Sequence, residues 1–238
     1  MHHIQQKILG KLLYAEWLNY ARLRPAGIES NHFSYHLEQL MRAKLIVKHD
    51  KRYTLTAQGL QHVDRLSHQR MAGRLQPHIV TAINLVNEAG QTLLYKRGFQ
   101  PYIGRSGFPL GKLHYEETTL AAAQRELAEK TGVTGVPLTH RGIVYLESKV
   151  EGVTISKVLY HLFDGTSGQT SQDPDPARGT SMWMDEATLA DHELMPGFRA
   201  IKKLLAAHPG EFFFEELCEN MVDRDVVPAP SYEAPRGT

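Results

Sequence analysis

A glycine followed by a glutamate-rich helix could hold a divalent cation within residues 111–133. The segment reads GKLHYEETTLAAAQRELAEKTGV, and its residues 118–130 contain no Gly or Pro, which predicts a helix. Glu129 and Lys130 follow Glu126 by three and four positions, so all three share one face of that helix. Two carboxylates beside a loop carbonyl form an oxygen-rich site suited to Mg²⁺ or Mn²⁺, which bind the phosphate oxygens of a diphosphate.

The other side of this helix must dock on a core if the carboxylates are to be held in place. Leu120, Ala123 and Leu127 recur at the helical period and predict that apolar stripe. A charged helix face can also be a solvated surface laced with ion pairs between residues four positions apart. The spacing of the remaining residues decides between these alternatives.

That spacing resembles the signature of the Nudix family. The family's box reads glycine, five residues, Glu, seven residues, and then Arg-Glu-apolar-x-Glu-Glu-x-Gly-apolar. The positions of this chain that fall on it are Gly111, Glu117, Arg125, Glu126, Leu127, Glu129, Gly132 and Val133. A match of this length at fixed spacing favours a functional site over a solvated helix face.

The resemblance implies a role for each matched polar residue. Gly111 would donate a backbone carbonyl to the metal, and Glu126 and Glu129 would bind it. Glu117 and Arg125 would brace the loop against the helix, so that these two and the two metal-binding glutamates form the expected catalytic set. A bound metal would then supply charge stabilisation and in-line positioning for cleavage of a diphosphate.

Lys130 departs from the box, because it stands where the family has the second Glu of a pair. Its ammonium is placed to pair with Glu126 and raises the electrostatic cost of binding Mg²⁺. The residues Pro109-Leu110-Gly111-Lys112 also replace the usual Pro-Gly-Gly-Lys, and His114 replaces a common Glu. Either a metal is held by fewer ligands and catalysis is weak, or the pocket binds its nucleotide without cleaving it. Glu147 and Glu151 are candidates for a further metal ligand.

The flanking sequence favours a whole domain of this family over residues 77–208. Alternation of apolar residues predicts strands, and Gly, Pro, Ser and Asp clusters predict the turns between them. The predicted segments are two strands within 78–97 around a turn at 87–90, β-rich runs at 141–146 and 153–163 joined by a polar connection at 147–152, a loop at 165–180, a strand at 181–185, a short helix at 186–189 and an amphipathic helix at 196–207. The resemblance implies a single α/β/α sandwich.

Residues 1–72 predict a separate unit of helices and one hairpin. We expect a first helix, a short second helix capped by Asn19, a third over 31–43 capped by Ser30, and a last one over 57–70. A hairpin with its turn at 49–52 precedes the last helix. The predicted core positions are Ile4, Ile8, Leu12 and Leu13 in the first helix, Phe33, Leu37, Leu40 and Met41 in the third, and Leu60, Val63 and Leu66 in the last.

This order of elements resembles the winged helix-turn-helix domains of bacterial regulators. The motif Phe33-x-Tyr35-His36-Leu37-x-x-Leu40 leads into Ala43-Lys44-Leu45-Ile46, as the third helix and wing do there. The resemblance implies that the third helix enters the major groove of duplex DNA and that the wing contacts phosphates. The expected DNA-binding residues are Asn31, His32, Ser34, Tyr35, Gln39 and Arg42 on the helix, and Lys48, His49, Lys51 and Arg52 on the wing.

The charge distribution supports a nucleic-acid partner. Lys and Arg outnumber Asp and Glu within residues 1–76, whereas the whole chain carries 27 Lys and Arg against 26 Asp and Glu. Such a basic domain in a near-neutral chain is typical of nucleic-acid binders. A winged helix used only for dimerisation or protein contact is the alternative, and Glu38 adds an unfavourable charge to the third helix.

Composition sets the remaining bounds on a fold of the α+β class. The 238 residues suit two small domains, and Cys218 is the single cysteine, so no internal disulfide is expected and a reducing cytoplasm fits. No apolar run is long enough to span a bilayer. Residues 209–238 are predicted as a C-terminal extension, in which Phe212, Phe213 and Phe214 form a docked surface or a homodimer contact and residues 226–238 form a flexible tail.

Two functions are compatible with these features. In the first, the chain is a DNA-binding transcriptional regulator whose second domain senses a nucleoside-diphosphate-linked metabolite similar to ADP-ribose. In the second, the chain is a working Mg²⁺- or Mn²⁺-dependent pyrophosphohydrolase of such compounds, and the winged helix localises or dimerises it. Lys130 and the basic first domain favour the regulator.

Overall fold

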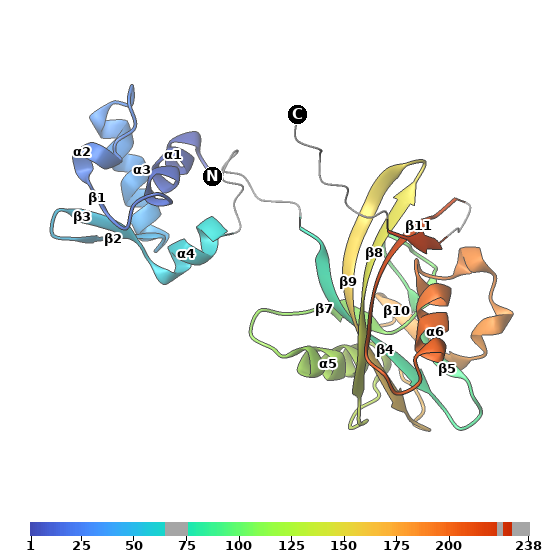
Figure 1. Cartoon of the computed structure of the whole chain (residues 1–238). Coiled ribbons are helices and arrows are strands. Elements are labelled where there is room, and N and C mark those ends of the chain that lie inside the picture. Colours follow the sequence, from blue (N-terminus) through green and yellow to red (C-terminus); the bar gives the residue numbers. More distant parts are fainter. Residues whose placement is uncertain (65–75, 223–225, 230–238) are drawn as a thin grey trace. The chain divides into compact units, whose positions relative to one another are not determined.

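The computed structural model describes residues 1–64, 76–222 and 226–229, and it divides into two compact units, Met1–Leu75 and Gln76–Thr238 (Figure 1). Each unit has a hydrophobic core of its own. No helix in the described residues is long and apolar enough to cross a membrane.

The first unit packs helices over a small antiparallel sheet. Its elements are α1 (His3–Leu12), β1 (Leu18–Asn19), α2 (Tyr20–Leu23), α3 (Ser30–Arg42), β2 (Ile46–His49), β3 (Arg52–Leu55) and α4 (Ala57–Asp64). The strand order is β1-β3-β2, so β3 is central. The buried core is formed by Ile4, Ile8, Leu9, Leu12, Leu23, Phe33, Leu37, Leu40, Ile46, Tyr53 and Val63.

Local capping in this unit follows the sequence in one case and departs from it in another. The Asn19 side chain accepts a hydrogen bond from the Arg22 amide at 2.9 Å, which confirms the predicted cap of α2. Ser30 is not the cap of α3, because the helix begins at Ser30 and Glu29 occupies the cap position without a side-chain bond. The Ser30 hydroxyl instead lies 2.9 Å from the hydroxyl of Tyr20, so a tertiary contact takes the group that a cap would use.

The hairpin and the last helix also differ from expectation. His49 pairs with Arg52, so only Asp50 and Lys51 form the turn, and Asp50 takes the left-handed backbone conformation that a tight turn requires. In α4 Val63 is buried as predicted, but Leu60 is 58 % exposed and does not contribute to the core. The predicted continuation to residue 70, with Leu66, lies outside the described residues.

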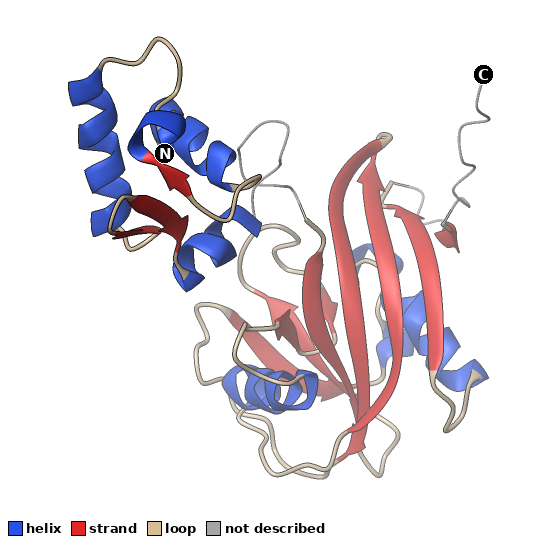
Figure 2. Ribbon diagram, turned by 60° about the vertical axis from the view of Figure 1, so that its left-hand side comes forward, coloured by secondary structure: helices blue, strands red, loops and turns tan. Residues whose placement is uncertain are grey.

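The second unit is a mixed sheet with one long helix on each face (Figures 1 and 2). Its strands are β4 (His78–Val86), β5 (Thr92–Arg97), β6 (Ser106–Gly107), β7 (Leu110–Lys112), β8 (Thr139–Val150), β9 (Val153–Thr166), β10 (Gly179–Met184), β11 (Phe213–Asn220) and β12 (Val226–Pro228). Its helices are α5 (Thr119–Thr131) and α6 (Phe198–Ala207), with the short 3₁₀ helices η1 (Glu186–Thr188) and η2 (Asp191–Glu193) before α6. The strands run in the order β10-β5-β4-β9-β8-β11-β12, with β6 paired to β5 and β7 to β4.

Alternate residues of the strands supply the cores beneath the two helices. On β4, Val80 and Ala82 pack with Phe198 and Ile201 of α6. Ile83 and Leu85 pack with Ala123 and Leu127 of α5 and with Phe163 of β9. This arrangement is the α/β/α sandwich that the sequence predicts.

The sheet extends beyond the predicted segments in two places. The strand β8 continues through residues 147–150, which were predicted as part of a polar connection, and only Glu151 and Gly152 form the turn, both with positive φ. The predicted connection fails because Ser148 is buried in the ladder while its charged neighbours lie on the other face. The sheet also continues past residue 208, because β11 pairs in parallel with β8 and buries Phe213 and Leu217.

Candidate functional site

The helix α5 is fixed at both ends by local sequence. Thr118 caps its N-terminus by accepting a hydrogen bond from the Ala121 amide at 3.2 Å, and Gly132 ends it in the left-handed conformation with φ of 69°. Ala123 and Leu127 are buried as predicted, but Leu120 is 41 % exposed and takes no part in the stripe. The buried face is instead completed by Ala122, Glu126 and Thr131, so the helix turns a carboxylate toward the sheet.

Gly111 is the backbone position against which that carboxylate packs. It lies in β7 opposite Thr81, and a Cβ atom added to it would lie 1.8 Å from Cδ of Glu126 and 2.0 Å from both carboxylate oxygens. Any side chain at this position would therefore overlap the carboxylate. The Glu126 side chain is only 7 % exposed, so the absence of a side chain at residue 111 is what lets it approach the backbone.

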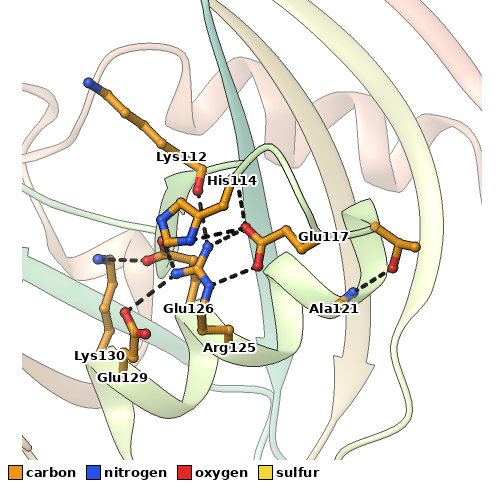
Figure 3. Close-up of polar contacts among 9 residues, drawn as sticks. Lys112, His114, Glu117, Ala121, Arg125, Glu126, Glu129 and Lys130 are labelled. Atoms are coloured by element: carbon orange, nitrogen blue, oxygen red, sulfur yellow. Dashed lines mark hydrogen bonds and ion pairs between the residues drawn. The ribbon is translucent and has the colours of Figure 1, made fainter. Parts of the chain in front are cut away.

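Both oxygens of Glu126 are paired with cations (Figure 3). Nη1 of Arg125 lies 2.7 Å from Oε1, and Nζ of Lys130 lies 2.9 Å from Oε2. The pairing of Lys130 with Glu126, which their spacing on the helix predicts, is confirmed. A buried carboxylate needs such partners, because an unpaired buried charge is strongly unfavourable.

Arg125 and Glu117 form the brace between the loop and the helix that the resemblance to the Nudix family implies. Nε and Nη2 of Arg125 donate to the two oxygens of Glu117 at 2.9 and 2.6 Å, and Nη2 also donates to the Lys112 carbonyl at 3.1 Å. The His114 amide donates to Glu117 at 2.6 Å. The hydrogen bonds from Arg125, aided by this amide, lower the pKa of Glu117 to about 2. The same hydrogen bonds with Glu117 raise the pKa of Arg125.

Glu129 lies at the rim of this cluster. Its side chain is 55 % exposed, and Oε2 is 3.4 Å from Nη1 of Arg125. It therefore shares the helix face with Glu126, as predicted, but it is solvated where Glu126 is buried. The structure brings together Gly111, Glu117, Arg125, Glu126 and Glu129, and it places Lys130 among them.

These residues do not fit a divalent metal as they lie. Within residues 1–64, 76–222 and 226–229 there is no group of three or more His, Cys, Asp or Glu that could hold a metal ion. Glu126 already has a cation on each oxygen. Glu147, a candidate for a further ligand, is paired with Lys149 and Lys157 and accepts a hydrogen bond from Thr154. Glu151 lies in the turn between β8 and β9.

Tyr95 belongs to the site although sequence reasoning did not select it. Its ring centroid on β5 lies 5.4 Å from Nζ of Lys130, which is within the range of a cation–π contact. Burial, followed by the charge of Asp175, raises the pKa of its hydroxyl. The sequence shows Tyr95 only as one position of a predicted strand, and the contact of its ring with Lys130 of α5 is what singles it out.

The residues predicted to bind DNA lie on α3 and on the β2–β3 hairpin of the first unit. All but Ser34 and Gln39 are exposed; these two are half-buried. The Ser34 hydroxyl lies 2.7 Å from the hydroxyl of Tyr20, so it is engaged inside the unit. The exposed residues are Asn31, His32, Tyr35 and Arg42 on α3, and Lys48, His49, Lys51 and Arg52 on the hairpin.

Trp17 joins this surface without having been predicted. The guanidinium carbon of Arg52 lies 4.1 Å from its ring centroid, which is within the range of a cation–π contact between the indole and the arginine of the hairpin. Arg42 is 3.9 Å from Glu38 of the same helix, and both side chains are largely exposed. An exposed pair of this kind is weak and leaves the arginine available to a partner.

The family model for the NUDIX domain matches residues 76–205. The NUDIX domain of Shewanella oneidensis NrtR, solved in complex with ADP ribose, is 16 % identical with a TM-score of 0.50, covering 64 % of this chain and 98 % of that one. A MutT protein from Bacillus halodurans is 22 % identical with a TM-score of 0.48, covering 63 % and 94 % of the two chains. One from Methanosarcina mazei is 26 % identical with a TM-score of 0.48, covering 56 % and 97 %.

No curated protein sequence matches the chain. The likeness to the Shewanella domain concerns the fold, and the family match rests on more than half of the chain, including the glycine, the brace and the helix described above. The chain belongs to the Nudix family.

Proposed function

We propose that this protein is a DNA-binding transcriptional regulator whose Nudix domain binds a nucleoside-diphosphate-linked metabolite and hydrolyses it weakly or not at all. The observation that carries the proposal is the state of Glu126, which is buried and has a cation on each oxygen. A divalent ion at this carboxylate would have to displace the Lys130 ammonium or lie beside it. Repulsion between charges at ~4 Å is on the order of 4 kcal/mol per pair of unit charges near a protein surface.

The parts of the site that do not touch the metal position remain intact. The Arg125–Glu117 brace holds the loop against α5, and Gly111 leaves space beside the backbone for the Glu126 carboxylate. Loss of the metal position alone would leave a site that still binds a diphosphate but lacks the means to polarise it. The Shewanella domain was solved with ADP ribose, so ADP-ribose is the first ligand to test here.

The first unit supports the DNA-binding half of the proposal. Its order of helix, strand, helix, helix and hairpin resembles that of winged helix-turn-helix domains, and in our proposal α3 is the recognition helix. Asn31 and Tyr35 are exposed on α3 and can reach base edges, whereas Lys51 and Arg52 of the hairpin suit phosphates. A homodimer would match a palindromic operator.

The test measures DNA binding and ligand binding on the same full-length protein. Fluorescence anisotropy with duplex DNA fragments from the region upstream of the protein's own gene is expected to show binding. The DNA affinity should fall steeply as the salt concentration rises, because each phosphate contact releases counterions. ADP-ribose is expected to raise the melting temperature and to change the DNA affinity, and DNA should change the ADP-ribose affinity by the same factor. Ligand binding without any coupling to DNA would overturn the regulator.

An active pyrophosphohydrolase is the second candidate, favoured by the intact Arg125–Glu117 brace. In that case the winged helix would serve localisation or dimerisation. Brisk release of AMP from ADP-ribose by the native protein in Mg²⁺ or Mn²⁺ would support this candidate against the first.

A further inference from the structure

We infer that Lys130 is a resident cation that takes the place of the divalent metal, so that the Nudix domain binds its diphosphate ligand without Mg²⁺ or Mn²⁺. This inference rests on the proposed function, because it assumes that the pocket binds such a ligand. It goes further in assigning the source of the positive charge that the ligand's phosphates require.

The position of the ammonium is the first support. Nζ of Lys130 lies 2.9 Å from Oε2 of Glu126, the buried carboxylate that rests on Gly111 (Figure 3). The centroid of the Tyr95 ring lies 5.4 Å from the same ammonium. Lys130 is thus held by two contacts rather than extended into solvent, and an ammonium has three donors, of which Glu126 uses one.

The exposure of the pair is the second support. The Lys130 side chain is 21 % exposed, whereas that of Glu126 is 7 % exposed. The carboxylate is therefore covered while part of the lysine still faces solvent. A phosphate oxygen can reach the lysine from that side, and a metal ion cannot reach Oε2 of Glu126 without displacing it.

The charge of the cluster is the third support. Glu117, Glu126 and Glu129 contribute −3, and Arg125 and Lys130 contribute +2, so the cluster carries −1. With the family's Glu in place of Lys130 the sum would be −3, and one divalent cation would return it to −1. The exchange of Glu for Lys therefore supplies the same change of charge as a bound metal. The cluster therefore presents to a diphosphate the same net charge, −1, as the family's box would with one divalent metal ion bound.

The inference predicts how metal ions affect binding. Native protein should bind ADP-ribose equally well, within about 2-fold, in EDTA and in MgCl₂ by isothermal titration calorimetry. Lys130→Glu should lose at least ~10-fold in affinity in EDTA, equivalent to roughly 1.4 kcal/mol, and should recover affinity when Mg²⁺ or Mn²⁺ is added. Lys130→Gln should lose affinity in EDTA and recover little, because it removes the ammonium without adding a carboxylate.

Direct metal binding provides a readout that does not depend on the nucleotide. Mn²⁺ alone should raise the melting temperature of Lys130→Glu and leave that of the native protein unchanged, because an ion that binds only the folded state stabilises it. Lys203→Glu is the matched control, since it makes the same charge change at an exposed residue of α6, on the opposite layer of the sandwich. It should behave as the native protein does in both experiments.

The outcomes separate this inference from the proposed function. Native binding of ADP-ribose that appears only with Mg²⁺ or Mn²⁺ would overturn the resident cation while leaving the regulator in place. Equal affinity of the native protein and Lys130→Gln in EDTA would also overturn it. Absence of binding by the native protein in both buffers would overturn the proposed ligand class and the inference together.

Discussion

Replacing Gly111 by Ala tests whether the approach of Glu126 to the backbone organises the site. The added Cβ would lie 1.8 Å from Cδ of Glu126, whereas carbon atoms in contact are separated by about 3.5–4.0 Å. The carboxylate would have to move by roughly 2 Å. The neighbouring Ala123 and Leu127 are buried against the sheet, so α5 itself cannot easily retreat.

The expected loss of stability follows from these contacts. Inserting one methyl group into a packed site costs about 1–3 kcal/mol. Breaking a fully buried ion pair costs about 3–5 kcal/mol, but Arg125 and Lys130 are 22 % and 21 % exposed and can be partly solvated, so less than this applies. We expect Gly111→Ala to lower the free energy of unfolding by about 2–4 kcal/mol.

A double-mutant cycle identifies the source of that loss. Unfolding in urea can be followed by the fluorescence of Trp183 in a Trp17→Phe background, since these are the chain's two tryptophans and Trp183 lies in the Nudix unit. With Glu126→Ala already in place the added methyl meets no carboxylate. Gly111→Ala should then cost much less, which gives a coupling of about 1–3 kcal/mol.

A glycine with open space around it provides the control. Gly168 has no atom within 4 Å of its added Cβ, and its backbone is not in the left-handed region, so Gly168→Ala should change stability by less than about 0.5 kcal/mol. Gly111→Ala could instead lower the free energy of unfolding by the same amount, to within ~0.5 kcal/mol, in the presence and in the absence of Glu126→Ala. The space at Gly111 would then not serve to accommodate the Glu126 carboxylate.

Three further predictions concern catalysis, acid stability and DNA. Lys130→Glu should raise the rate of Mn²⁺-dependent hydrolysis of ADP-ribose by at least ~10-fold, roughly 1.4 kcal/mol of transition-state stabilisation, and adding Glu126→Gln to that variant should remove the gain. Brisk turnover by the native protein that Lys130→Glu leaves unchanged would count against this prediction. The pKa of Glu117 is about 2 in the folded protein against an ordinary value of 4.5, so its contribution to the free energy of unfolding is present above pH 4.5 and is lost as pH falls toward 2. Glu117→Gln should therefore flatten the plot of the free energy of unfolding, measured in urea, against pH over that range. An unchanged plot would show that the brace does not stabilise the fold. Arg52→Ala should weaken binding to all DNA sequences alike and reduce the salt slope by about 1, whereas Asn31→Ala should relax sequence preference; anisotropy titrations that show no difference between the two variants would refute these roles.

Features that depend on near neighbours in the chain were predictable. The pairing of Lys130 with Glu126 follows from their spacing of four residues, and the limits of α5 follow from Thr118 and Gly132. The Nudix spacing also placed Gly111 and Glu117 beside the helix, because the box is itself a local loop–helix motif. These inferences need only the helical period and the chemistry of caps.

Features that depend on packing between distant segments were not predictable in this way. Leu120 belongs to the apolar period of α5 but is exposed in the first turn of the helix, and the helical period alone does not show what packs against that turn. Tyr95 reaches Lys130 from β5, a strand more than thirty positions away in the chain. Ser30 has the residue type of a cap but bonds Tyr20 instead. In each case a tertiary contact overrides a local preference.

The strand β11 has a consequence for how the chain can be shortened. It covers one side of β8 along Gly142–Lys149, in parallel register from Phe213 to Asn220. A chain that ended at residue 208, where the sequence suggests that the domain is complete, would leave that side of β8 without its partner and uncover Val144 and Leu146 nearby. A long unpaired strand edge next to apolar surface is a template for pairing with other molecules. Shortened forms meant to isolate the Nudix domain should therefore aggregate unless they extend at least through Asn220.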